Sequence, residues 1–255
     1  MRFSTGAVRD YARCGGSDLP ETLEEARLLR SVYQGAGHIP VTWWENGDVW
    51  GSDFRDGPGD VEPSGGSELP DLYFFTGHGS CQNPPTSTSP DFLVVCGNFG
   101  TPDTVNIGTQ SRWGNGPGPL KFLIVDASCP MDLVSLAANW FPVFVGLHVA
   151  VGHSGTVNAD TLDSSVRGYD FAQRTIGFAM TGDPFDFANW FIPKQSVGWA
   201  WMDAGLIDIE DGCSPVAIAA GATEAEAVDR RDNEKIDDGR PAPTANWLAW
   251  RWRTA

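Results

Sequence analysis

The chain lacks any apolar run long enough to cross a membrane, and its first 30 residues contain no apolar core of signal-peptide length. These absences predict a cytoplasmic protein without a membrane partner. Basic residues are also few, since 17 Lys and Arg face 33 Asp and Glu, for a formal net charge of -16. Such a charge argues against a nucleic-acid partner and favours a solvated acidic surface, with cationic ligands as a further option.

Cysteine and histidine are scarce, which limits the expected metal and disulfide chemistry. The cysteines are odd in number and lack CxxC spacing, so we predict neither a disulfide framework nor a zinc ribbon, and we expect a free thiol. His148 and His153 lie in a strand-like stretch at a spacing that points them to opposite faces. No metal site and no cofactor are therefore predicted, although calcium held by acidic loops stays open as an alternative. The five cysteines are Cys14, Cys81, Cys96, Cys129 and Cys213.

Apolar residues make up 41% of the 255 residues, which is enough to build a substantial core. The stretches "LYFFTG" from residue 72, "LKFLIVDA" from 120 and "VFVGLHVAVG" from 143 are continuous apolar runs, typical of strands buried on both faces. Helical patterns at 17–37, after Cys129 and at 162–180 alternate with them. We therefore predict an α/β fold with a mostly parallel central sheet flanked by helices.

The whole chain, 1–255, is expected to form one domain, with its core at 70–180 and a C-terminal extension, 181–255, packed on it. In that extension "PVAIAAG" is strand-like, a helix is predicted from the capping box of Thr223 and Glu226, and "NWLAWRWR" is a closing strand. Near the N-terminus, the Asn46-Gly47 pair predicts a hairpin between strands at 41–44 and 48–54.

Two residues suited to catalysis follow the apolar runs directly: His78 in "FFTGHGS" and Cys129 in "FLIVDASCP". Ligands of open α/β sheets bind beyond the carboxyl ends of the strands, so we expect His78 and Cys129 to meet there. A histidine can take the thiol proton and return it to the leaving group. Gly79 allows close approach to a substrate, and its N–H, with that of Cys129, is expected to bind an oxyanion.

These two motifs resemble the paired signatures of the caspase–hemoglobinase superfamily of cysteine peptidases, which includes caspases, legumains and gingipains. In that superfamily one strand ends in His-Gly and the next strand of the sheet ends in Ala-Cys, after an acid or amide. The resemblance covers residues 70–155, points to a bacterial branch, and implies a caspase-like fold with His78 as base, Cys129 as nucleophile and Gly79 as oxyanion donor. Ser128, inserted between Ala127 and Cys129, and Pro130 depart from the pattern.

Further residues are candidates for substrate contacts. Asp126 matches the acid before the nucleophile, and His153, Ser154 and Gly155 follow the strand that lines the cleft in the resemblance. Asp53 suits a basic or amine group. His148 is interpreted as a hydrogen-bonded core residue. The stretch Gly152–Thr156 imitates the elbow of a serine hydrolase at Ser154, but it lacks the last glycine of that motif.

The sequence thus predicts a cysteine-dependent hydrolase that acts on peptide or amide bonds through a His-Cys dyad and a thioester. Its substrate would be a peptide or a small molecule with an amide. If an amine resolves the thioester, the same residues make a biosynthetic transferase or cyclase. A non-catalytic binding module that retains the fold is the alternative from another class.

Overall fold

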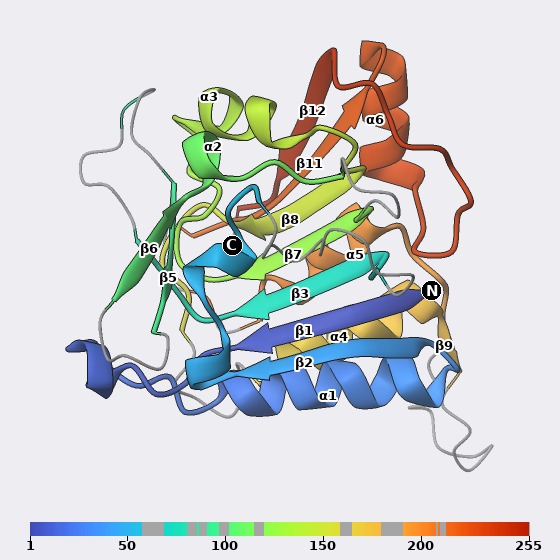
Figure 1. Cartoon of the computed structure of the whole chain (residues 1–255). Helices are drawn as coiled ribbons and strands as arrows, with labels where there is room; N and C mark the ends of the chain where they lie inside the picture. The colour runs from blue at the N-terminus through green and yellow to red at the C-terminus, as the bar shows by residue number, and fades with distance from the viewer. Residues whose placement is uncertain are drawn as a thin grey trace.

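The computed structural model describes residues 1–57, 69–80, 86, 91–96, 102–114, 120–158, 165–179, 191–207, 209 and 213–254. Its centre is a seven-stranded sheet in the order β12-β11-β8-β7-β3-β1-β2 (Figure 1). The strands are β1 (Arg2–Ala7), β2 (Ile39–Glu45), β3 (Leu72–Thr76), β7 (Phe122–Asp126), β8 (Val149–His153), β11 (Pro215–Gly221) and β12 (Trp247–Trp252). Neighbours from β2 to β8 are parallel, whereas β11 is antiparallel to both β8 and β12. The predicted α/β fold with a mostly parallel sheet is confirmed.

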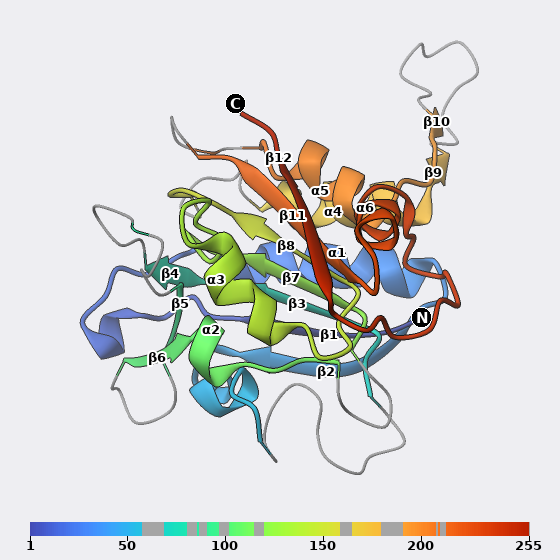
Figure 2. The same ribbon diagram turned by 90° about the horizontal axis from the view of Figure 1, so that it is seen from above.

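Helices cover both faces of this sheet. On one face lie α1 (Thr22–Gly35), α4 (Val166–Ile176) and α5 (Val197–Ala204), with α6 (Glu224–Asn233) beside α5 (Figure 2). The other face carries the short helices α2 (Ile107–Gln110) and α3 (Leu136–Trp140) and a small sheet of β4 (His78–Ser80), β5 (Phe92–Val95) and β6 (Asp103–Asn106). A two-stranded sheet joins β9 (Phe178–Ala179) to β10 (Phe191–Ile192).

The central strands are apolar throughout because each of their faces is buried in a different core. In β3, Phe74 packs in the core that α1, α4 and α5 share. Its neighbours Tyr73 and Phe75 pack in the opposite core, with Trp113 and Trp140. Side chains of a strand alternate between the two faces, so a strand buried on both sides shows no polar alternation. This confirms the interpretation of the first two apolar runs, whereas in the third only Val149–His153 forms a strand.

The C-terminal segment completes the central sheet. Strands β11 and β12 form its edge beyond β8. The predicted helix cap is present, because Thr223 Oγ1 accepts from Glu226 N at 3.2 Å, but the Glu226 carboxylate accepts from Ala222 N and does not close the box on Thr223 N. The hairpin predicted for 41–54 is wrong. The chain instead pairs β2 in parallel with β1 and then forms the 3-10 turns η2 (Asn46–Asp48) and η3 (Gly51–Asp53), with Asn46 at φ +47°.

No disulfide framework was predicted, but the structure contains a disulfide. Cys14, in the turn η1 (Ala12–Cys14), is bonded to Cys96 after β5, with their Cα atoms 6.1 Å apart. The bond ties the N-terminal segment to the small sheet. Sequence spacing did not reveal it, because the two cysteines are separated by 82 residues and meet only through the fold. No helix in the described parts of the chain is long and apolar enough for a membrane span.

Candidate functional site

Strands β3 and β7 are neighbours at the centre of the sheet and end at the same edge. Their last residues, Thr76 and Asp126, are paired in register, and Gly77 N donates to Asp126 O at 3.1 Å. A pocket of ≈ 290 Å³ opens beyond this edge. The segments that follow the two strands therefore reach the same pocket. Its lining comprises Leu19, Gly77, His78, Gly79, Asp126, Ser128, Thr156 and Val157.

His78 is half-buried at this pocket and held from two sides. Its Nε2 lies 2.8 Å from the carbonyl oxygen of Ser17, and its ring contacts Tyr11 edge-on at a centroid distance of 4.3 Å. The hydroxyl of Tyr11 also accepts from His78 N at 2.9 Å. A carbonyl oxygen only accepts hydrogen bonds, so its contact assigns the proton of a neutral imidazole to Nε2. Nδ1 then carries the lone pair and is the atom able to take a proton.

Gly79 brings the histidine segment against the end of β7. A Cβ atom at position 79 would lie 1.9 Å from Ser128 O and 2.8 Å from Ser128 C. Backbone therefore meets backbone here, and no other residue fits without moving one of the two segments. This contact explains how residues far apart in sequence come to share one pocket.

Cys129 differs from its prediction in three respects. Its sulfur is disulfide-bonded, so the expected free thiol is wrong at this position. Its backbone N donates to Gly155 O at 3.0 Å, so this amide is not free to bind an oxyanion. The residue is only 4% exposed and adopts φ +60°, a left-handed conformation that is uncommon for a residue other than glycine. In this oxidised form the sulfur is not a nucleophile, because only a thiolate attacks.

Ser128 is the residue of this segment that lines the pocket, and the sequence prediction passed over it. It is half-buried, and its Oγ accepts from Val157 N at 3.2 Å. One signal in the sequence pointed to it, because Ser128 directly follows Ala127, where the resemblance has its nucleophile. The prediction chose the next residue, Cys129, because the nucleophile of the resembled superfamily is a cysteine.

The predicted substrate contacts lie mostly outside the pocket lining. His153 is fully buried. Ser154 N and Oγ both contact Ser214 O, and Gly155 packs against Cys213, whose Cα would lie 2.7 Å from an added Cβ. The lining instead uses the next two residues, Thr156 and Val157.

Asp53 is also outside the lining. Its carboxylate accepts from Trp50 N at 2.7 Å in η3, and burial raises its pKa to about 6. The carboxylate of Asp53 therefore stabilises the local turn through Trp50 N, whereas it was expected to meet a basic group of the substrate.

Asp126 reaches the pocket, but its carboxylate belongs to a buried charge cluster beneath it. Arg167 Nε, on α4, donates to Asp126 Oδ2 at 2.7 Å. Glu25, on α1, accepts from Thr76 Oγ1 at 2.7 Å and from Gly168 N at 3.1 Å. Burial and the Asp126 charge hold the pKa of Glu25 well above its usual range. The neighbouring Arg167 and hydrogen bonds hold the pKa of Asp126 well below its own, despite burial. Asp126 is thus the charged partner of Arg167, and the cluster fixes the end of β7.

Cys213, His153 and Asp126 follow one another in the order of a catalytic triad. Cys213 Sγ lies 3.7 Å from His153 Nδ1, and His153 Nε2 lies 3.3 Å from Asp126 Oδ1. None of the three side chains is more than 2% exposed. Burial raises the pKa of Cys213 to about 11 and lowers that of His153. We interpret this row as a structural contact, because a protonated thiol sealed from solvent does not attack a substrate.

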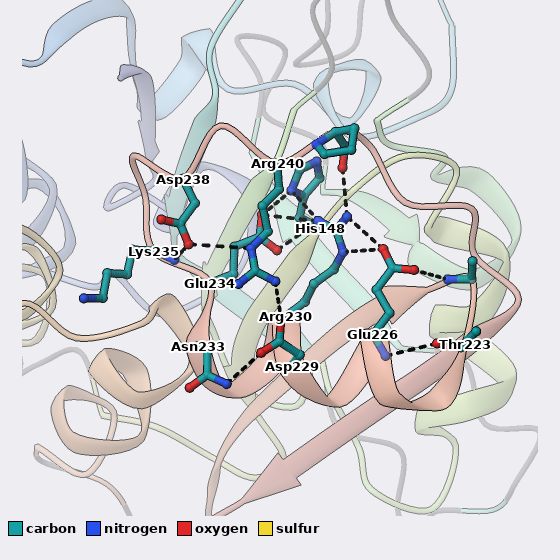
Figure 3. A network of polar contacts seen from close by, with 12 residues as sticks. His148, Thr223, Glu226, Asp229, Arg230, Asn233, Glu234, Lys235, Asp238 and Arg240 are labelled. Carbon is teal, nitrogen blue, oxygen red and sulfur yellow. Dashed lines mark hydrogen bonds and ion pairs between the residues drawn. The ribbon is translucent and has the colours of Figure 1, made fainter.

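His148 has the structural role predicted for it. Its Nδ1 lies 2.5 Å from Glu234 Oε1 and 3.0 Å from Arg230 Nη1, both on or next to α6 (Figure 3). Arg230 also contacts Glu226 and donates to Pro241 O. The network joins β8 to α6, and its three central side chains are buried. In the described residues no group of three or more His, Cys, Asp or Glu side chains is arranged to hold a metal ion.

Comparison with known protein families matches residues 5–254 to one family model, described as a domain of unknown function (DUF6345). The match covers nearly the whole chain, including the pocket and both strands that end at it. No curated protein matches the chain.

Proposed function

The chain belongs to the DUF6345 family, and we propose that it is a hydrolase of peptide or amide bonds that works by acyl transfer at the pocket beyond β3 and β7. One observation carries the proposal: His78 and the residues after β7 share this pocket, with the Gly79 backbone packed on Ser128. A general base and a nucleophile must lie within hydrogen-bond reach of one another and of the substrate carbonyl. The shared pocket lining supports the proposal, because it brings a histidine and a candidate nucleophile to one site.

In this proposal each part of the pocket has a task. His78 Nδ1 takes the proton of the nucleophile and later returns it to the leaving amine, while Ser17 O holds the ring through Nε2. The Gly79 N–H is the candidate oxyanion donor in this proposal, because Gly79 lines the pocket directly after His78. The Asp126–Arg167 ion pair holds the end of β7 in place from below.

A caspase-like form of the fold is part of the same proposal. It is supported by β3 and β7, which are adjacent and parallel, one leading to His78-Gly79 and the other to Ala127-Ser128-Cys129. The resemblance implies this placement of the two motifs. Cys129 was the nucleophile expected from it, and a cysteine mechanism requires that its disulfide first be reduced. A transferase or cyclase outcome uses the same pocket and differs only in whether water or an amine resolves the acyl-enzyme.

A mixture of peptides of diverse sequence tests the proposal, with cleavage followed by mass spectrometry with and without a thiol reductant. We expect cleavage by the wild type and a loss of about 100-fold or more in kcat/KM for His78→Ala, the usual range for a general base. His38→Ala is the matched control, because His38 lies at the start of β2 and not in the pocket lining, and it should retain the rate. Absence of cleavage and of amine transfer by folded protein under both conditions would favour the binding module.

A further inference from the structure

We propose that Ser128 Oγ, and not Cys129 Sγ, is the nucleophile of this pocket. The inference rests on the proposed acyl-transfer function and names the atom that attacks. It comes from the contrast between two adjacent residues. Ser128 is half-buried and lines the pocket, whereas Cys129 is 4% exposed, is disulfide-bonded and is not among the lining residues.

The backbone after β7 accounts for this difference. Cys129 adopts φ +60° and its N–H is bonded to Gly155 O, so the chain turns sharply after Ser128 and is anchored there. Strained backbone at the end of a strand is a recurrent way to present a reactive side chain. Here the residue before the turn, Ser128, is left at the pocket.

The serine hydroxyl is free to act as an acid toward the base. Its oxygen accepts a hydrogen bond from Val157 N at 3.2 Å, and that contact leaves the hydroxyl hydrogen available. His78, in the same pocket, has its Nε2 on Ser17 O and its Nδ1 lone pair available. With a neutral imidazole, Nδ1 is therefore an acceptor and the Ser128 hydroxyl a donor.

The reaction follows from these states. As Ser128 Oγ forms a bond to the substrate carbonyl carbon, its proton passes to His78 Nδ1. The C–N bond then breaks, and the proton moves from Nδ1 to the departing amine. This leaves an ester on Ser128. Water then attacks the ester carbonyl as its proton passes to His78 Nδ1. The bond from the carbonyl carbon to Ser128 Oγ breaks, and the proton moves from Nδ1 to Oγ, which releases the acid and restores the serine. No oxidant, reductant or cofactor takes part.

A serine nucleophile predicts a different response to reductant from a cysteine nucleophile. Activity should be present in the fully oxidised protein, because the disulfide of Cys129 is then part of the scaffold. The experiment treats the oxidised full chain with a fluorophosphonate probe and locates the adduct by peptide mass spectrometry. We expect an adduct on Ser128, its loss in Ser128→Ala, and labelling slower by about 100-fold or more in His78→Ala.

Two further variants complete the design. Ser31→Ala removes an exposed serine of α1 and should label at the wild-type rate. Ser128→Cys should become reactive to iodoacetamide at position 128 in the absence of reductant, which separates loss of the nucleophile from loss of the fold. Thermal unfolding checks that each variant is folded.

The alternatives give distinct results. Peptide cleavage could appear only after reduction, persist in Ser128→Ala and be lost in Cys129→Ala. That result would overturn Ser128 as the nucleophile and keep the proposed function. An adduct on Ser154 would overturn Ser128 as the nucleophile and would support the serine-hydrolase elbow at Ser154. Folded protein that forms no adduct and cleaves no peptide under either redox condition would overturn both proposals.

Discussion

Asp126 and Glu25 place two carboxyl groups beside the guanidinium of Arg167, where water is excluded. Glu25 favours its protonated form and Asp126 its ionised form, as the opposite directions of their pKa values indicate. A buried charge without its partner costs several kcal/mol, whereas a neutral acid is mimicked by its amide. The two acids should therefore respond differently to the same chemical change.

Asp126→Asn is expected to lower the free energy of unfolding by about 3–5 kcal/mol, because it leaves the Arg167 charge buried without its 2.7 Å partner. Glu25→Gln is the matched control and should cost about 1 kcal/mol or less, since it retains hydrogen-bonding groups toward Thr76 and Gly168. Urea unfolding at pH 7 measures both. Equal losses would mean that Glu25 and Asp126 share the charge of Arg167.

At the scale of elements, the close approach of β4 to the end of β7 depends on a missing side chain. Gly79→Ala would put a methyl group 1.9 Å from a backbone oxygen, so one segment must move. We expect a loss of about 1–3 kcal/mol of stability, typical of overpacking, together with loss of the acyl-transfer rate.

Gly35→Ala at the end of α1 is the control, because no atom lies within 4 Å of an added Cβ there. Removing the extra freedom of glycine should stabilise the protein by about 0.4–1 kcal/mol. Thermal unfolding and peptide cleavage of the two variants give the comparison. A Gly79→Ala protein with wild-type stability and rate would show that the two segments do not need to touch.

Elements with strong local patterns were predictable from the sequence. The apolar runs that contain β3, β7 and β8 and the Thr223 cap of α6 correspond to observed elements. The Asn46-Gly47 signal misled, because a local turn preference does not decide which strand residues 39–45 pair with. That segment, β2, pairs in parallel with β1, and the turns η2 and η3 follow it.

At the scale of the whole molecule, the disulfide-bonded cysteines differ from the reduced cysteines expected of a cytoplasmic protein. The Cys14–Cys96 bond and the bonded state of Cys129 are typical of an oxidising environment, whereas the cytoplasmic location stays a prediction from the sequence. Cys213 is free and buried. The redox state of the compartment therefore decides whether Cys129, next to the pocket residue Ser128, is oxidised or reduced.

Replacing Cys14 and Cys96 by Ser together should lower the free energy of unfolding by about 4 kcal/mol, from the loop entropy that an 82-residue separation implies. Cys213→Ala, which removes a buried thiol and no cross-link, should cost about 1 kcal/mol. Urea unfolding without reductant measures both. An unchanged midpoint for the double variant would indicate that the bond does not form in the native protein.

The sequence alone determined the class of fold, the central strands and the edge at which chemistry is expected. These follow from local hydrophobicity and from the rule that parallel strands end together. Only the tertiary structure decided the state of each candidate: a disulfide on Cys129, burial of His153, a structural pairing for Asp126, and Ser128 at the pocket. These states depend on contacts between segments that are distant in the sequence. Two adjacent residues can therefore differ, as Ser128 lines the pocket whereas Cys129 is buried.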